Sequence, residues 1–116
     1  MSYITINIIK RCIMKKSYAE YAPVFKAISD ETRLKIIDML SYESEMCACN
    51  ILEEFSISQP TLSYHIKILS ESGLINARRD GSWMKYTLNK DRAEEILGFL
   101  SWIINENKAA ECKKCE

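Results

Sequence analysis

Glycine, proline and histidine are scarce in this sequence, whose 116 residues include three glycines, two prolines and one histidine. The three glycines do not form a phosphate-binding loop, and we find no nucleophile paired with a base or carboxylate pair placed for catalysis. Long hydrophobic runs are absent as well, because the longest, residues 96–104, is much shorter than the roughly 20 residues that span a bilayer. We therefore predict a protein that is not an enzyme, has no organic cofactor and does not cross a membrane.

The chain has no excess charge of either sign, since 16 Lys and Arg balance 16 Asp and Glu. The charges are unevenly distributed, however. Residues 30–55 hold two basic and seven acidic side chains, whereas residues 56–90 hold five basic and two acidic ones. The segment 56–90 is therefore the part of the chain predicted to face an anionic partner such as nucleic acid.

Five cysteines in so short a chain would suggest disulfides in a secreted protein, but the number is odd and the first residues do not resemble a signal peptide. Free thiols in a reducing cytoplasm are the better interpretation. Residues 1–16 have no clear period and are interpreted as an N-terminal arm, with Met14 an alternative start. Residues 108–116 are interpreted as a mobile tail that carries two of the cysteines.

Hydrophobic periodicity and capping residues predict a mainly α-helical chain with one small β-hairpin. Asp30 and Ser58 are expected to cap helices, Pro23 and Pro60 suit first helical turns, and Gly73 suits a helix C-terminus. Asp80-Gly81 is expected to form the hairpin turn. The predicted helices cover about 17–29, 31–42, 47–55, 59–72 and 91–107, and the predicted strands cover 74–79 and 82–88.

A short helix, a turn of about four residues, a helix with an acid-free polar face and a hairpin follow one another in the order of a winged helix-turn-helix. A single domain over residues 17–107 is expected to bind double-stranded DNA. The polar helix face would meet base edges or phosphates in the major groove, and the basic hairpin would bind phosphate. The candidate DNA-binding residues are Gln59, Thr61, Ser63, Tyr64 and Lys67 on the helix and Arg78, Arg79 and Lys85 on the hairpin.

Four segments, at residues 24–40, 45–55, 58–75 and 78–88, together resemble the ArsR/SmtB family of metal-sensing repressors. The resemblance runs over about two thirds of the chain. It implies a homodimer that binds an imperfect inverted repeat and leaves it when an ion binds, with the first and last helices in the dimer interface. Residues 91–107 are independently too apolar for one packing partner. His65 occupies the family's Ser-x-His position and is expected to pack or hydrogen-bond near the DNA.

The sequence Glu-Met-Cys-Ala-Cys-Asn at residues 45–50 resembles the family's Cys-x-Cys box, which makes Cys47 and Cys49 candidate ligands of a soft ion. Residues two apart in a regular helix point about 200° away from each other. Ion capture is therefore expected to distort the start of the third helix and move the next one. The resemblance favours arsenite or antimonite as inducer, and the third sulfur is left open among Cys12, Cys112 and Cys115.

Three alternatives remain at this point. The same fold would serve a cadmium or lead sensor, the cysteines would form a redox switch that oxidises to disulfides, or the chain would be a thiol-based metal buffer without a DNA partner. A zinc site along the last helix, as in zinc-sensing relatives, is not expected because residues 91–107 contain no histidine.

Overall fold

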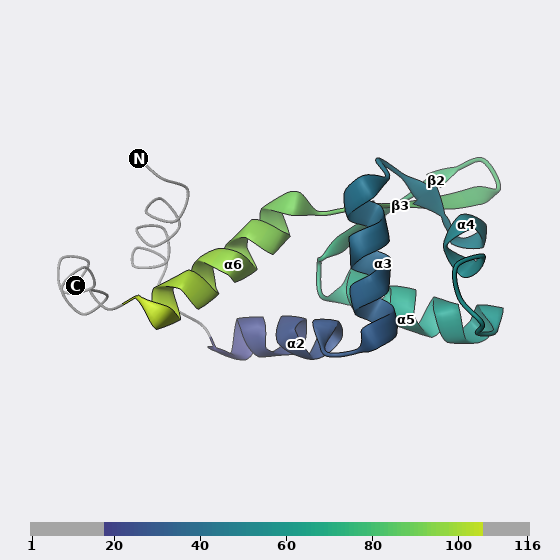
Figure 1. Ribbon diagram of the computed structural model, residues 1–116. Helices are drawn as coiled ribbons and strands as arrows, with labels where there is room; N and C mark the ends of the chain where they lie inside the picture. The colour runs from purple at the N-terminus through teal and green to yellow at the C-terminus, as the bar shows by residue number, and fades with distance from the viewer. Residues whose placement is uncertain (1–17, 106–116) are drawn as a thin grey trace. The chain divides into compact units, whose positions relative to one another are not determined.

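The computed structural model describes residues 18–105, which form five helices and three short strands (Figure 1). The calls on residues 1–17 and 106–116, which include Cys12, Met14, Cys112 and Cys115, lie outside the described residues. No helix within residues 18–105 combines the length and the apolarity that a bilayer crossing requires. In chain order the elements are α2 (Tyr18–Ile28), α3 (Glu31–Tyr42), β1 (Met46–Cys47), α4 (Ala48–Leu52), α5 (Gln59–Glu71), β2 (Ile75–Asp80), β3 (Trp83–Leu88) and α6 (Lys90–Ile104).

Side-chain caps set the starts of two helices, as the sequence predicts. The Asp30 carboxylate accepts a hydrogen bond of 3.1 Å from the Arg33 backbone N–H at the start of α3. The Ser58 hydroxyl accepts one of 3.3 Å from the Thr61 N–H at the start of α5. Beyond α5, Gly73 takes the left-handed conformation at φ 84° that ends many helices.

Pro23 is the exception among the predicted helix signals, because it lies inside α2 rather than in its first turn. The helix begins at Tyr18, so Pro23 is its sixth residue. A proline tolerates the helical φ but has no N–H, so α2 lacks the hydrogen bond that residue 23 would otherwise donate.

The sheet has three antiparallel strands in the order β1-β3-β2. The pairs of β2 with β3 run from Ile75–Leu88 to Asp80–Trp83, so the two-residue turn is Gly81-Ser82, one position later than predicted. Gly81 has φ 65°, which an L side chain rarely adopts. The additional strand, β1, pairs Met46 with Tyr86 and Cys47 with Lys85 and was not predicted.

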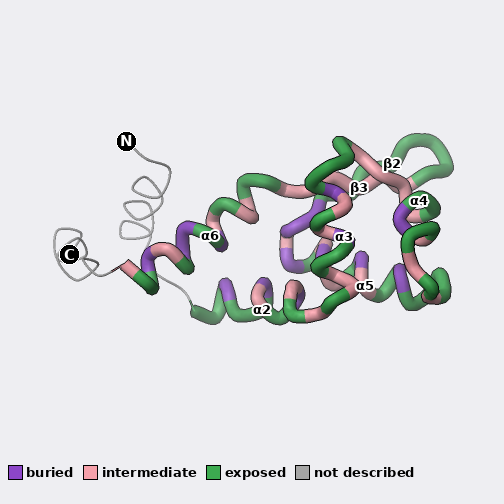
Figure 2. Tube along the Cα trace, in the orientation of Figure 1, coloured by how far each residue is buried: buried purple, intermediate pink, exposed green. Residues whose placement is uncertain are grey.

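Residues 22–90 form one of two compact units, with a core contributed by α2 to α5 and the sheet. Ile36 and Ile51 are completely buried, and Figure 2 shows buried positions recurring along α5 between exposed ones. Leu34 does not join this core as its spacing predicts, since it is 52% exposed. The buried apolar side chains of this unit are Val24, Ala27, Ile36, Leu40, Ile51, Leu62, Ile66, Leu69, Leu74 and Ile75.

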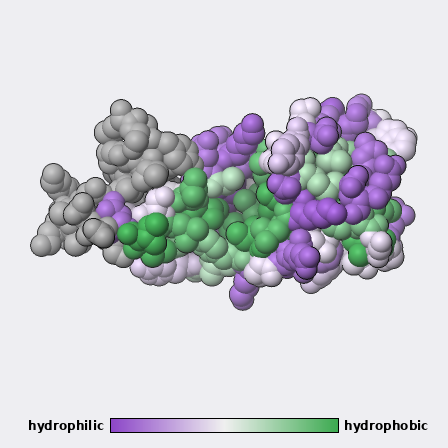
Figure 3. All heavy atoms as spheres, in the orientation of Figure 1, coloured by the Kyte–Doolittle hydropathy of each residue, from purple (hydrophilic) through white to green (hydrophobic). Residues whose placement is uncertain are grey.

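The other unit contains, of the described residues, 18–21 and 91–105. Its contacts are aromatic: the Tyr21 ring stacks on Phe99 with centroids 4.7 Å apart, and Tyr18 meets Phe99 edge-on. Much of α6 nevertheless remains apolar and exposed, and in Figure 3 the surface toward its C-terminal end is hydrophobic. The exposed apolar side chains of α6 are Leu97, Leu100, Ile103 and Ile104.

Candidate nucleic-acid interface and thiol site

The face of α5 that the sequence predicts to meet DNA is open to solvent. Leu62, Ile66 and Leu69 point into the core, which leaves the opposite face of the helix free. No acidic residue occurs in the first turn of α5, where a carboxylate would repel phosphate. The exposed candidates on this helix are Gln59, Thr61, Ser63, Tyr64 and Lys67.

His65 differs from these residues, because it turns toward the start of α3. Arg33 Nη1 donates a hydrogen bond of 3.0 Å to His65 Nδ1, and the Asp30 carboxylate lies 3.9 Å from the same nitrogen. Only 12% of the His65 side chain is exposed. Since an arginine can only donate, Nδ1 carries a lone pair in this contact, and His65 links α5 to α3.

Arg33 also holds the end of α2, because its Nε donates a hydrogen bond of 2.6 Å to the Ala27 carbonyl oxygen. The Arg33 backbone N–H, given to the Asp30 carboxylate, keeps the pKa of Asp30 below its ordinary value. One arginine thereby connects the end of α2, the start of α3 and the middle of α5.

The hairpin presents its basic side chains unequally. Arg78 forms two hydrogen bonds of 2.7 Å with the Glu45 carboxylate, 33 positions earlier in the chain. Lys85 lies 3.3 Å from the Asp80 carboxylate. For Arg79, which is exposed, no ion pair is found within residues 18–105. Arg79 is therefore the hairpin arginine most directly available to a phosphate.

Glu45 and Arg78 form a bidentate salt bridge. The guanidinium of Arg78 lowers the pKa of Glu45, and the carboxylate in turn raises the pKa of Arg78. Both groups therefore remain charged at neutral pH. Because the Arg78 side chain is 56% exposed, we assign the pair a positional role rather than a large contribution to stability.

Cys47 and Cys49 do not both lie in a helix, contrary to the sequence-based prediction. Cys47 has extended backbone angles, φ −84° and ψ 160°, belongs to β1 and caps α4, which begins one residue later. Cys49 is exposed in the first turn of α4. The 200° separation applies only within a regular helix. At a junction between strand and helix, both side chains can approach without unwinding α4.

The Cys49 thiol donates a hydrogen bond of 3.8 Å to the Asn50 side-chain oxygen, and the Cys47 and Cys49 thiols influence each other's ionisation. The contact with Cys49 is the largest influence that lowers the pKa of Cys47, and the same contact raises the pKa of Cys49. The pair therefore loses its first proton more readily than an isolated thiol. Since the thiolate is the form that ligates metals, this arrangement favours capture of a thiophilic ion.

Within residues 18–105 no cluster of three or more His, Cys, Asp or Glu residues is placed to hold a metal ion. The described chain thus supplies two sulfurs. The other candidate ligands, Cys12, Cys112 and Cys115, are among the residues that are not described.

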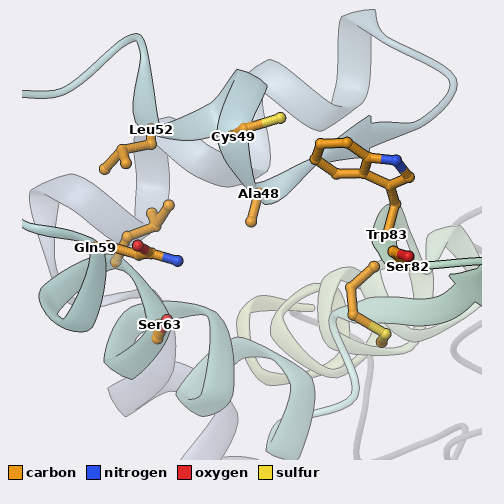
Figure 4. Close-up of a pocket in the computed structure, with 9 residues that line it drawn as sticks. Ala48, Cys49, Leu52, Gln59, Ser63, Ser82 and Trp83 are labelled. Atoms are coloured by element: carbon orange, nitrogen blue, oxygen red, sulfur yellow. The ribbon is translucent and has the colours of Figure 1, made fainter.

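A groove of about 350 Å³ adjoins Cys49 and lies between α4, the start of α5 and the hairpin turn (Figure 4). The Cys49 and Trp83 side chains point toward each other across its edge. The groove is lined by Ala48, Cys49, Leu52, Gln59, Leu62, Ser63, Ser82, Trp83 and Met84.

Residues 30–77, from the cap of α3 into β2, match the model of the arsR family of bacterial regulatory proteins. An arsenical resistance operon repressor of Staphylococcus aureus is 42% identical to this chain over 97 residues, which are 84% of the chain and 92% of that protein. The chain belongs to the ArsR family. It is a DNA-binding transcriptional repressor with a winged helix-turn-helix fold, and its relatives are regulators rather than enzymes.

Two further ArsR-family comparisons extend this assignment. A cadmium resistance transcriptional regulatory protein CadC homolog of Staphylococcus aureus is 33% identical, over 79% of this chain and 76% of its own. The solved structure of an ArsR-like transcriptional regulator from Rhodococcus sp. RHA1 superposes with a TM-score of 0.68 at 27% identity, covering 84% of this chain and 86% of that one. Relatives named for arsenic and for cadmium both match, so the family alone does not identify the inducer.

Three parts of this site were missed by sequence reasoning: β1, the Glu45–Arg78 pair and the groove beside Cys49. A strand of two residues is too short to show an alternating pattern. The other two features join segments more than 30 positions apart, and no local signal in the sequence marks them.

Proposed function

We propose that this ArsR-family repressor binds operator DNA as a homodimer in the cytoplasm and releases it when Cys47 and Cys49 capture arsenite or antimonite. The observation that carries the proposal is the placement of two free cysteines at the junction of β1 and α4, with Cys47 at the end of the strand and Cys49 exposed in the first turn of the helix. Trivalent arsenic and antimony are thiophilic, and two cysteines two positions apart at a strand–helix junction can supply two sulfur ligands without unwinding a helix. The relatives named arsenical resistance operon repressors support the choice of ion.

In this proposal α5 enters the major groove of the DNA, and the hairpin lies along the sugar-phosphate backbone. Donors and acceptors at the start of α5, from Gln59, Thr61 and Ser63, would read base edges, while Tyr64 and Lys67 would contact phosphate or sugar. Arg79 would contact phosphate directly. For Arg78 and Lys85, a phosphate would first have to replace the carboxylate that each of them contacts. His65 would position α5 through Arg33.

Two connections would carry ion capture to the DNA-binding elements. Through β1, Cys47 pairs with Lys85 of the hairpin, and Glu45 two positions earlier holds Arg78. Through α4, the chain runs from Cys49 to the start of α5 at Gln59, ten positions later. An ion that draws the two sulfurs into its own coordination geometry would shift both the hairpin and α5. The coupling free energy is the difference between the ion's binding free energies to the DNA-bound and the released conformations.

The exposed apolar residues of α6 support the homodimer. Leu97 and Ile104 are 51% and 77% exposed, and apolar side chains repeated along one helix usually have a partner in the assembled protein. A second copy of the chain would cover them and place two α5 helices for an inverted repeat.

Release from DNA tests the proposal. A duplex selected for tight binding from a random pool is titrated with arsenite, antimonite, cadmium and peroxide in parallel, and bound protein is followed by fluorescence anisotropy. Cys47→Ser and Cys49→Ser are expected to keep DNA affinity and to lose release by arsenite, while Ser41→Ala, at an exposed serine away from the thiols, behaves as wild type. Retained arsenite response in both cysteine variants would refute the thiol site.

The other ligands in the same titration separate the remaining functions. Release by cadmium but not by arsenite would assign the protein to the cadmium-type relatives, one of which is among its matches. Release by peroxide, with a disulfide between Cys47 and Cys49 detected by mass spectrometry, would assign a redox switch instead.

A further inference from the structure

The turn between α4 and α5 sets the direction of α5, because α4 ends at Leu52 and α5 begins at Gln59. Its backbone hydrogen bonds are local: the Glu54 N–H donates to the Ile51 carbonyl oxygen at 3.1 Å, and the Phe55 N–H donates to the Leu52 carbonyl oxygen at 3.0 Å. Bonds between residues three positions apart curve the chain but do not fix it against the rest of the domain. The direction of α5 therefore depends on contacts that reach the turn from other elements.

Lys35 of α3 makes such a contact. Its Nζ donates a hydrogen bond of 3.1 Å to the Glu54 carbonyl oxygen and lies 4.9 Å from the centre of the Phe55 ring. A cation over an aromatic face is attracted by the electron density of the ring. One ammonium group thereby contacts two consecutive residues of the turn, and it does so from a helix 19 positions earlier in the chain.

The helix that carries Lys35 is itself well anchored. Ile36, the next residue, is completely buried and Leu40 is 3% exposed, so α3 provides a fixed base for the contact. Lys35 forms no ion pair within residues 18–105, so no carboxylate there competes with the turn for its ammonium group. Lys35 belongs neither to α5 nor to the hairpin, the two elements that we expect to touch DNA.

We propose that Lys35 is a positioning residue for DNA recognition, which acts through Glu54 and Phe55 to hold α5 in the direction that enters the major groove. The inference rests on the proposed docking of α5 and does not depend on the inducer. A turn that is ordered before binding loses less conformational entropy when DNA binds, so the contact contributes to affinity without touching the DNA. Such a contribution does not depend on salt, because Lys35 itself displaces no counterion from a phosphate.

DNA affinity at several salt concentrations tests this role. Lys35→Met keeps an unbranched side chain with a similar helix propensity but removes the ammonium group, whereas Lys35→Arg keeps a cation with hydrogen-bond donors. The full chain is titrated against the selected duplex and followed by fluorescence anisotropy. We expect Lys35→Met to bind about fivefold more weakly at each salt concentration, with an unchanged slope of log affinity against log salt concentration.

Two further variants are the controls for this titration. Lys35→Arg should bind within about twofold of wild type, because it restores the contact with the turn. Lys26→Met removes one positive charge from an exposed position of α2 and should also bind within about twofold of wild type.

Amide hydrogen exchange reports on the turn itself. Loss of the contact should free the turn locally, so we expect the amides of residues 53–57 to exchange about fivefold faster in Lys35→Met than in Lys35→Arg. Amides of α3 around the buried Ile36 should exchange as in wild type, which would show that the fold is retained.

Three results would overturn the inference. An affinity of Lys35→Met within about twofold of wild type would show that the contact does not matter for DNA binding. A salt slope shallower by about one unit would make Lys35 a direct phosphate contact instead. Equal exchange of the turn in Lys35→Met and wild type would remove the physical cause. A failure of the proposed docking looks different, because Lys67→Ala and Gln59→Ala would then bind DNA as wild type does, whichever result Lys35→Met gives.

Discussion

At the scale of single residues, we expect Glu45 to compete with DNA for Arg78. Its carboxylate holds the guanidinium through two hydrogen bonds of 2.7 Å, so a phosphate can use Arg78 only by replacing Glu45. Arg79, the next residue, has no such competitor within the described chain. Neighbouring arginines of one strand therefore differ in what they offer the phosphate backbone.

Glu45→Gln is expected to strengthen DNA binding, because it removes the charge that holds Arg78. The slope of log affinity against log salt concentration should steepen by up to about one unit as a further phosphate contact forms. Arg79→Ala is the opposite control, with weaker binding to all sequences and a shallower slope. Anisotropy titrations at several salt concentrations measure both. Equal slopes for Glu45→Gln and wild type would contradict a competition at Arg78.

His65 is expected to contribute to stability rather than to direct DNA contact. His65→Ala removes the acceptor of the 3.0 Å hydrogen bond from Arg33 and leaves a partly buried donor, at a cost of about 1–3 kcal/mol in the free energy of unfolding. Lys67→Ala is the control, because Lys67 lies on the exposed face of α5. It should leave the free energy of unfolding unchanged and weaken DNA binding. Urea denaturation and anisotropy titration measure the two effects. A His65→Ala variant as stable as wild type would contradict the positioning role.

At the scale of secondary structure elements, the short strand β1 is the connection on which the proposed function depends. It ties the thiol pair to the hairpin, because Cys47 pairs with Lys85 across the sheet, while α4 leads from the same cysteine to α5. The proposed thiol site is thus connected to the hairpin by strand pairing and to the start of α5 by the chain. A bound ion can therefore influence them together, without the unwinding of a helix that spacing alone implied.

Ser58 sets where α5 begins, and Ser58→Ala is expected to lower the free energy of unfolding by about 1 kcal/mol. The variant loses the acceptor for the Thr61 N–H and the hydroxyl contact of 2.9 Å with the Thr61 side chain. Ser56→Ala, at an exposed loop position, is the matched control and should be neutral. Thermal unfolding followed by circular dichroism measures both. Equal melting temperatures of the two variants would show that the cap is unimportant.

At the scale of the whole molecule, the concentration of exposed apolar side chains on α6 favours association with a second copy of the chain. Residues 22–90 leave four large hydrophobic side chains exposed on several elements, whereas the single helix α6 leaves four exposed by itself. The family is one of DNA-binding repressors, and binding to an inverted repeat requires two reading helices related by a twofold axis. The apolar face of α6 is the surface that we expect a second chain to cover.

Leu97→Glu combined with Leu100→Glu is expected to convert the proposed dimer to a monomer, because it would bury two carboxylates from each chain in the proposed interface. Leu34→Glu is the matched control, since Leu34 is as exposed as Leu97 but lies on α3. Sedimentation velocity measures the mass of each variant, and anisotropy measures the accompanying loss of DNA affinity. A double variant that sediments as wild type would place the interface elsewhere.

The sequence by itself determined the order of the elements, two helix starts, the hairpin and the family, because caps, turns and hydrophobic periods act between residues a few positions apart. The caps at Asp30 and Ser58 are examples. Only the tertiary structure decided that Cys47 lies in a strand, that Glu45 holds Arg78 and that a groove opens beside Cys49. These features depend on the sheet that brings distant segments together, and the pairing of a two-residue strand is determined by its partner rather than by its own pattern.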